Sequence, residues 1–183
     1  LYRSRLDKTL KGLNARLDAE VRERTAQLEA SEARLKEAQR IARVGDWSAE
    51  EPGKEILWSD GLYEIFGRDR SRPAPRREEY LRDMVLPEDR ESVRAKMEAG
   101  LVTGGPNSIE HRFRRPDGSI GWVRLESRQH DDDLGRPGSV RGIVQDITLQ
   151  KSTELALAEL NANLERRVEE RATALFESEL RLR

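Results

Sequence analysis

The sequence of 183 residues contains no cysteine, which excludes disulfides, thiol redox chemistry and cysteine-ligated metals. We therefore expect a cytoplasmic location. No apolar run approaches the ~20 residues that a helix needs to span a bilayer. Aromatic residues make up only 5% of the chain and charged residues 38%, so the chain as a whole is too polar for one compact core.

The scarce residue types are concentrated in the middle of the chain. All seven prolines, 12 of the 13 glycines and seven of the nine aromatic residues lie between Gly45 and Thr148. The flanks consist almost entirely of good helix formers. This distribution predicts a long helix over residues 1–43, one domain over residues 44–148 and a second long helix over residues 149–183.

The charge distribution bears on partners and location. The formal net charge of −1 gives no reason to expect a nucleic-acid partner. Near the N-terminal end, a single acid, Asp7, is surrounded by four basic residues: Arg3, Arg5, Lys8 and Lys11. Such a cluster is typical of the cytoplasmic side of a membrane helix, which here would precede the sequence and would place the chain at the inner membrane. A solvated helix end explains the cluster equally well.

Residues 13–36 recur near the C-terminus as residues 160–183, with identity at 12 of 24 positions. In both copies the apolar residues follow the spacing of a coiled-coil seam, interrupted by two consecutive steps of four that locally relax the supercoil. The seam comprises Leu10, Leu13, Leu17, Val21, Leu28 and Leu35 in the first helix, and Leu160, Leu164, Val168, Leu175 and Leu182 in the second.

A charged helix with one narrow apolar stripe needs a partner helix to bury that stripe. The simplest partner is a second copy of the chain, which predicts a parallel homodimer through both helices. An antiparallel hairpin between the two helices, or pairing with a different chain, remains an alternative.

The middle of the chain predicts an α+β domain with a five-stranded antiparallel sheet. Two short strand signals, "GDWS" and "EILW", come first, and three helical segments follow. Ser59 and Gly67 are suited to cap the first helix, and Pro87 suits the first turn of the third. A hairpin with the turn "PDG" and a last strand, "SVRGIVQDIT", complete the order ββαααβββ.

The ordered set "GDW", "LPEDRESV", "EHRFRRPDGSIGWV" and "GRPGSVRGIVQDIT" resembles the PAS sensory domain with its PAC motif, over residues 38–152. The flanking helices resemble the coiled-coil signalling linkers of bacterial sensor histidine kinases and diguanylate cyclases. The resemblance implies the PAS fold, with strand order 2-1-5-4-3, helices closing a pocket on one face and a linker helix capping the other. It also implies a sensor and relay role, with an upstream sensor or membrane segment and a downstream PAS or output domain in the same chain.

Apolar and aromatic residues of the domain would either line a small-molecule pocket or simply fill a core. The candidates are Trp58, Phe66, Tyr80, Met84, Met97, His111 and Phe113. His111 shares a strand face with Ile109 and Phe113. It could serve as a ligand contact or pH sensor, but packing with a hydrogen bond inside the sheet is the favoured interpretation.

No cofactor is evident from the sequence, although an unidentified small molecule remains an alternative. A flavin–cysteinyl adduct, as formed in light-oxygen-voltage domains, is excluded because there is no cysteine. A haem bound as in similar PAS domains would need an axial histidine between residues 60 and 103, where none occurs. Haem ligation through Met84 or Met97 stays open on sequence grounds alone.

Two acidic clusters suggest enzymatic chemistry but have simpler explanations. The acids of "PEDR", residues 87–90, could act in general acid–base catalysis, yet helix capping and local ion pairing explain them better. His130 with residues 131–133 could bind a metal, as in a small metal-dependent hydrolase. A solvated turn is the better interpretation, because consecutive residues at a hairpin tip cannot all converge on one ion.

The segment "DIT", comprising Asp146, Ile147 and Thr148, joins the last strand to the outgoing helix. Thr148 is placed to cap that helix and Asp146 to fix the end of the strand. The PAS resemblance implies that this junction transfers the signal. The sequence has no phosphoacceptor histidine on a coil, no glycine-rich ATP loop and no "GGDEF"-like signature, so we expect this segment to lack catalytic activity.

Overall fold

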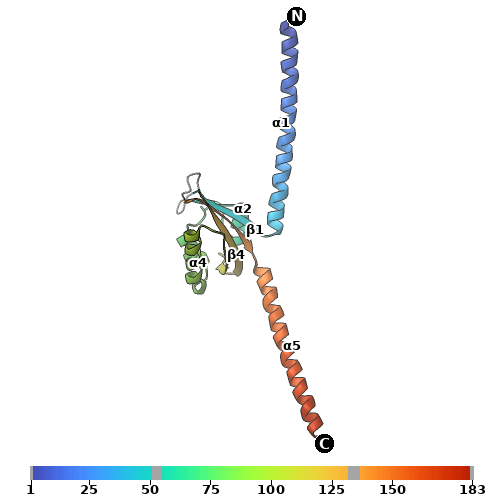
Figure 1. The fold of residues 1–183 in the computed structure, drawn as a ribbon, viewed down its shortest axis with the longest axis vertical. Coiled ribbons are helices and arrows are strands. Elements are labelled where there is room, and N and C mark those ends of the chain that lie inside the picture. Colours follow the sequence, from blue (N-terminus) through green and yellow to red (C-terminus); the bar gives the residue numbers. More distant parts are fainter. Residues whose placement is uncertain (1, 51–54, 132–136, 182–183) are drawn as a thin grey trace. The chain divides into compact units, whose positions relative to one another are not determined.

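The fold is described from a computed structural model of the chain (Figure 1). It describes the backbone of residues 2–50, 55–131 and 137–181, and the side chains of residues 11–50, 55–130 and 138–174. The chain divides into two compact units, Leu1–Arg43 and Val44–Arg183.

The first unit is a single helix, α1 (Tyr2–Ile41). Its 40 residues give a length of about 60 Å at 1.5 Å per residue. Ion pairs along the surface link Glu20 to Arg24 and Glu37 to Arg40, as expected for residues one turn apart. After the helix, Arg43 adopts a left-handed φ of 52°, the position that glycine usually fills at a helix C-terminus.

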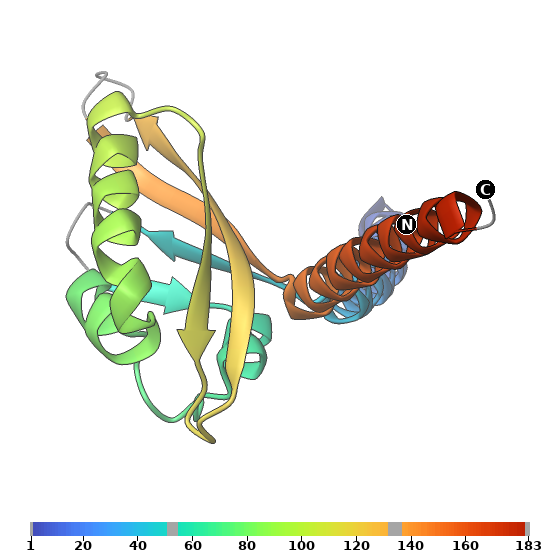
Figure 2. The same ribbon diagram turned by 90° about the horizontal axis from the view of Figure 1, so that it is seen from below.

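The second unit contains a five-stranded antiparallel sheet with the order β2-β1-β5-β4-β3, which confirms the expected order (Figure 2). Its strands are β1 (Val44–Ala49), β2 (Ile56–Trp58), β3 (Asn107–Arg114), β4 (Ile120–Asp131) and β5 (Pro137–Asp146). The long β4 pairs with both β3 and β5, and the turn predicted at "PDG" joins β3 to β4.

Short helices connect β2 to β3. They are α2 (Asp60–Phe66), α3 (Arg77–Glu79), the π-helix η1 (Tyr80–Met84), the 3-10 helix η2 (Pro87–Asp89) and α4 (Arg90–Thr103). Gly67 ends α2 in the left-handed conformation, as predicted. The Ser59 side chain does not cap α2 but accepts a hydrogen bond from the Asp46 amide, so it ties α2 to β1.

The core lies between these helices and one face of the sheet. Phe66 from α2 packs edge-to-face on Phe113 from β3, with ring centroids 4.9 Å apart, and stacks on Trp58 at 5.0 Å. Leu62 and Val123 are also almost fully buried in this cluster. The alternation of buried and exposed residues along β3 has the period of two that the sequence predicted.

The unit ends in α5 (Thr148–Arg181), a helix of 34 residues. Beyond its first turn, the side chains of α5 that the structure describes are exposed. Among the described residues, no helix combines the length and apolar character needed to cross a membrane.

Candidate functional site

A cavity of about 700 Å³ lies between the helices and the inner face of the sheet. Four of the seven predicted pocket residues line it: Trp58, Phe66, Tyr80 and Met97. The other three, Met84, His111 and Phe113, are buried but do not line the cavity. The wall and rim also include Trp47 from β1 and Arg76 and Arg77 at the start of α3, none of which could be singled out from the sequence.

His111 is 2% exposed, and its Nε2 lies 2.7 Å from the Tyr80 hydroxyl oxygen, a hydrogen-bonding distance. This is the packed arrangement favoured from the sequence. Burial lowers the pKa of His111 to about 4, against the weaker opposing effect of the Asp89 charge. Burial also raises the pKa of Tyr80 far above its usual range. Both side chains are therefore neutral at pH 7 and cannot switch charge near neutrality.

The junction between β5 and α5 is tied to β4 through hydrogen bonds. The Ile147 amide donates to the Trp122 carbonyl and the Trp122 amide donates to Thr148 Oγ1, each at 2.9 Å. The Asp146 carboxylate accepts hydrogen bonds from both the amide and the hydroxyl of Thr148. Asp146 thus supplies the cap expected of Thr148, and the Thr148 hydroxyl holds the junction to the neighbouring strand.

Arg115 connects this junction to a cavity-lining helix. Its guanidinium donates through Nη2 to the Asp146 carboxylate at 2.9 Å and through Nε to the Ile65 carbonyl of α2 at 3.0 Å. The same guanidinium lies over the Phe113 ring, 4.7 Å from its centroid. Arg115 therefore connects α2 directly to the start of α5 through hydrogen bonds.

A second connection fastens the first turn of α5 to the outer face of the sheet. Lys151 Nζ lies 2.8 Å from Glu110 Oε2, and Arg124 Nη2 lies 2.8 Å from Glu110 Oε1. Lys151 and then Arg124 lower the pKa of Glu110 through these hydrogen bonds. The Lys151 ammonium also lies 5.6 Å from the centre of the Trp122 ring, within the range of a cation–π contact.

The "PEDR" acids have no arrangement suited to acid–base catalysis. Asp89 pairs with Arg112 of β3, with Oδ1 2.6 Å from Nη2, and also accepts the Arg112 backbone amide. These bonds hold the pKa of Asp89 below its usual range, mainly through the Arg112 side chain. The pairing is structural, but it reaches across 23 residues, and the Asp89 side chain does not cap α4, so the capping and the local pairing expected from the sequence are both wrong for Asp89.

The described residues contain no group of three metal-ligating side chains. His130 lies exposed near the end of β4. The Asp131 side chain and residues 132–133, the other members of the suggested metal site, lie outside the described residues.

The seam residues whose side chains the structure describes are 48–67% exposed within the single chain. They are Leu13, Leu17, Val21, Leu28, Leu35, Leu160, Leu164 and Val168. The side chains of Leu10 and Leu175, and all of Leu182, lie outside the described residues.

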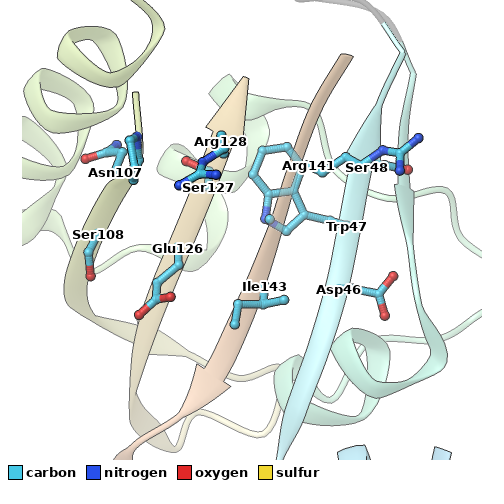
Figure 3. Close-up of a pocket in the computed structure, with 12 residues that line it drawn as sticks. Asp46, Trp47, Ser48, Asn107, Ser108, Glu126, Ser127, Arg128, Arg141 and Ile143 are labelled. Carbon is cyan, nitrogen blue, oxygen red and sulfur yellow. The ribbon is translucent and has the colours of Figure 1, made fainter. Parts of the chain in front are cut away.

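The outer face of the sheet has a shallow hollow of about 710 Å³, shown in Figure 3. Across its middle, Ile143 is directly opposite Glu126 on one side and Asp46 on the other. Two residues farther along the same strands, Arg128 and Arg141 are directly opposite each other. The mixture of exposed charges of both signs shows a solvated surface with no reactive grouping.

The second unit is a small α+β domain whose last strand, β5, leads directly into the long helix α5. Residues 55–144 match the family described as PAS fold, so the chain contains a PAS domain. It is also 28% identical over 152 residues to a blue-light-activated histidine kinase of Brucella anthropi. The match covers 82% of this chain but only 30% of that protein's length.

Solved structures with the same fold include a sensory box histidine kinase/response regulator from Burkholderia thailandensis. Its TM-score is 0.58 at 24% identity, over 73% of this chain and 98% of that chain. The N-terminal domain of a diguanylate cyclase with PAS/PAC sensor from Marinobacter aquaeolei has a TM-score of 0.54 at 20% identity, over 59% of this chain and 98% of that chain. At these identities the two structures establish the fold.

Proposed function

We propose that this chain is the PAS relay segment of a sensor histidine kinase, passing a conformational change from the sheet into α5. The relative from Brucella anthropi supports a kinase context, because the similarity extends over 152 residues and is not confined to the PAS domain. The segment itself carries out no reaction in this proposal. A diguanylate cyclase parent is the alternative, with the same relay role.

The main support for the proposal is the junction between β5 and α5. Residues 146–148 are bonded to β4 through Trp122 and to α2 through Arg115, and α5 begins at Thr148 without an intervening loop. A helix that starts within a hydrogen-bonded network must follow any shift of that network. A flexible linker in this place would absorb the shift.

The proposal includes a parallel homodimer through α1 and α5, with the exposed leucine and valine stripe as the seam. Two consecutive steps of four interrupt the heptad pattern in both helices. Such an interruption offers two packings of similar energy, which a switch requires. We place the chain in the cytoplasm, next to an upstream sensor or membrane segment and a downstream output domain.

An insertion series tests the proposal. The chain is fused after α5 to a histidine-kinase core, and one to seven residues are inserted within residues 155–170. If α5 transmits a rotation, autophosphorylation should vary with helical phase, and an insertion of seven residues should restore the parental activity. If insertions of two and five residues, which turn the helix about half a turn out of phase, act like the insertion of seven, helical relay is wrong.

A further inference from the structure

Helix α2 is fastened at its start to the beginning of β1. The Ser59 amide donates to the Asp46 carbonyl, and the Asp46 amide donates to Ser59 Oγ, each at 2.9 Å. Only residues 42 and 43 separate the end of α1 from the first residue of β1. A displacement at the end of α1 therefore acts on the chain close to the point where α2 is attached.

Two glycines bring the backbones of β1 and α2 into direct contact beside these bonds. A Cβ on Gly61 would lie 2.9 Å from the Val44 carbonyl oxygen, and a Cβ on Gly45 would lie 2.5 Å from the amide nitrogen of Leu62. Both distances are below 3.0 Å, closer than a Cβ normally approaches another atom. Because backbone touches backbone here, neither side can yield by changing a rotamer, and a shift of β1 towards α2 has to displace that helix.

The other end of α2 is attached to the start of α5. The Ile65 carbonyl accepts a hydrogen bond from Arg115 Nε at 3.0 Å, and the same guanidinium donates to the Asp146 carboxylate at 2.9 Å. Asp146 in turn accepts the amide of Thr148, the first residue of α5. The seven residues of α2, about 10 Å at 1.5 Å per residue, therefore connect the start of β1 with the start of α5.

A second route between the same two points runs through the sheet. β1 is paired with β5 along its whole length, and Val44 lies opposite Gln145, next to the junction. The sheet route consists of many backbone pairs, whereas the route through α2 depends on one side chain, Arg115. Substitutions can therefore separate the two routes.

We propose that Gly45 and Gly61 are positioning residues that transmit a displacement of β1 through α2 and Arg115 to the start of α5. The input in this proposal is the end of α1, so the route needs no molecule in the cavity. As a description of signalling, the inference rests on the proposed relay function. The coupling itself is a property of the domain and is measured without an output domain.

A double-mutant cycle on the full chain tests the route. Gly61→Ala pushes α2 away from β1, and we expect hydrogen exchange of the Thr148 amide to accelerate about tenfold. Exchange of the Leu125 amide, in a strand paired on both sides, should change less than about twofold. In the background of Arg115→Gln, which cuts the link from α2 to the junction, Gly61→Ala should alter Thr148 exchange less than about twofold.

The matched control is Gly100→Ala, which crowds a different helix. A Cβ on Gly100 of α4 would come within 2.6 Å of the Asn107 side-chain nitrogen, off the route through Arg115. This control should not accelerate Thr148 exchange. Equal acceleration of Thr148 and Leu125 by Gly61→Ala would show general destabilisation, and an undiminished effect of Gly61→Ala beside Arg115→Gln would assign transmission to the sheet. Either result would overturn the proposal.

A milder variant keeps the test decisive if Gly61→Ala does not fold. Ser59→Ala removes the acceptor of the Asp46 amide and leaves the glycine contact in place. It should accelerate Thr148 exchange about threefold, and only while Arg115 is present. Independent effects of Ser59→Ala and Arg115→Gln would overturn the proposal.

The insertion series in α5 separates this inference from the relay function. Independent effects in the cycle together with a phase-dependent insertion series would keep the relay and remove α2 from it. Coupled effects together with an insertion series that ignores helical phase would keep the link through α2 and reject the relay.

Discussion

Arg115 and Asp146 form an ion pair of 2.9 Å in which the aspartate side chain is only 7% exposed. The two residues are 31 positions apart, at the β3–β4 turn and at the end of β5. The same arginine holds the last turn of α2 through the Ile65 carbonyl. One side chain therefore joins the cavity-lining helix, the sheet and the start of α5.

Replacing Asp146 by asparagine should destabilise the domain. The substitution leaves the partly buried Arg115 guanidinium without its counter-charge, and we expect a loss of about 2 kcal/mol in the free energy of unfolding. Urea denaturation followed by circular dichroism measures this. Asp117→Asn, at the exposed turn of the same hairpin, is the control and should change stability little. Equal effects of the two substitutions would remove the special role of the ion pair.

Thr148 allows a finer test of the junction. Thr148→Val keeps the side-chain shape but removes the acceptor for the Trp122 amide, which should cost about 1–2 kcal/mol. Hydrogen exchange of that amide should accelerate. Thr148→Ser retains the oxygen and should keep the amide protected. An equally fast exchange in both variants would show that the hydroxyl does not hold the strand.

His111 predicts how stability depends on pH. Its folded pKa of about 4 lies below its ordinary value of 6.5, so the unfolded chain takes up the proton first. Stability should therefore be unaffected by His111 above about pH 6.5 and fall as pH drops from about 6.5 to about 4, with a loss of about 2 kcal/mol by about pH 5. The stabilising carboxylates Asp89 and Glu110 lose their charge only at lower pH, because their folded pKa values are depressed.

Denaturation curves at several pH values check this prediction. The variant His111→Gln removes the titrating group, and its stability should be nearly independent of pH between about 5 and 6.5. An unchanged slope in this variant would assign the pH dependence to another group.

Glu110 should hold the first turn of α5 to the sheet. Glu110→Gln removes the charge that pairs with Lys151, so the amides of residues 151–154 should exchange faster with solvent. Glu126→Gln, on the same face of the sheet and without an ion pair among the described residues, is the matched control. If the control accelerates exchange as much as Glu110→Gln does, the effect comes from the change in net charge on that face of the sheet and not from the ion pair.

The element order could be predicted from the sequence because turn signals and strand alternation are local, whereas the strand order was implied only by the resemblance to the PAS family. The "PDG" turn and the alternation of Ile109, His111 and Phe113 fix β3 and β4 without tertiary information. The second of the three expected helical segments instead consists of the short α3 followed by the π-helical turn η1.

The cavity could be predicted only in part. Side chains on one face of a strand point in the same direction but are buried to different extents. Phe113 and His111 are covered by Phe66 and Tyr80, whereas Trp47 reaches the cavity across Gly142. Arg115 was missed because its partners, 50 and 31 residues away, become neighbours only when the sheet has formed.

The most direct test of the relay uses the absence of cysteine, which makes a single introduced thiol uniquely labelled. A spin label at Glu159→Cys on α5 gives the distance between the two helices of the proposed dimer by electron–electron double resonance. Asp146→Asn and Thr148→Val should shift or broaden that distance distribution, and Asp117→Asn should not. A distribution that is the same in all four proteins, or no distance within the dimer at all, would contradict the account.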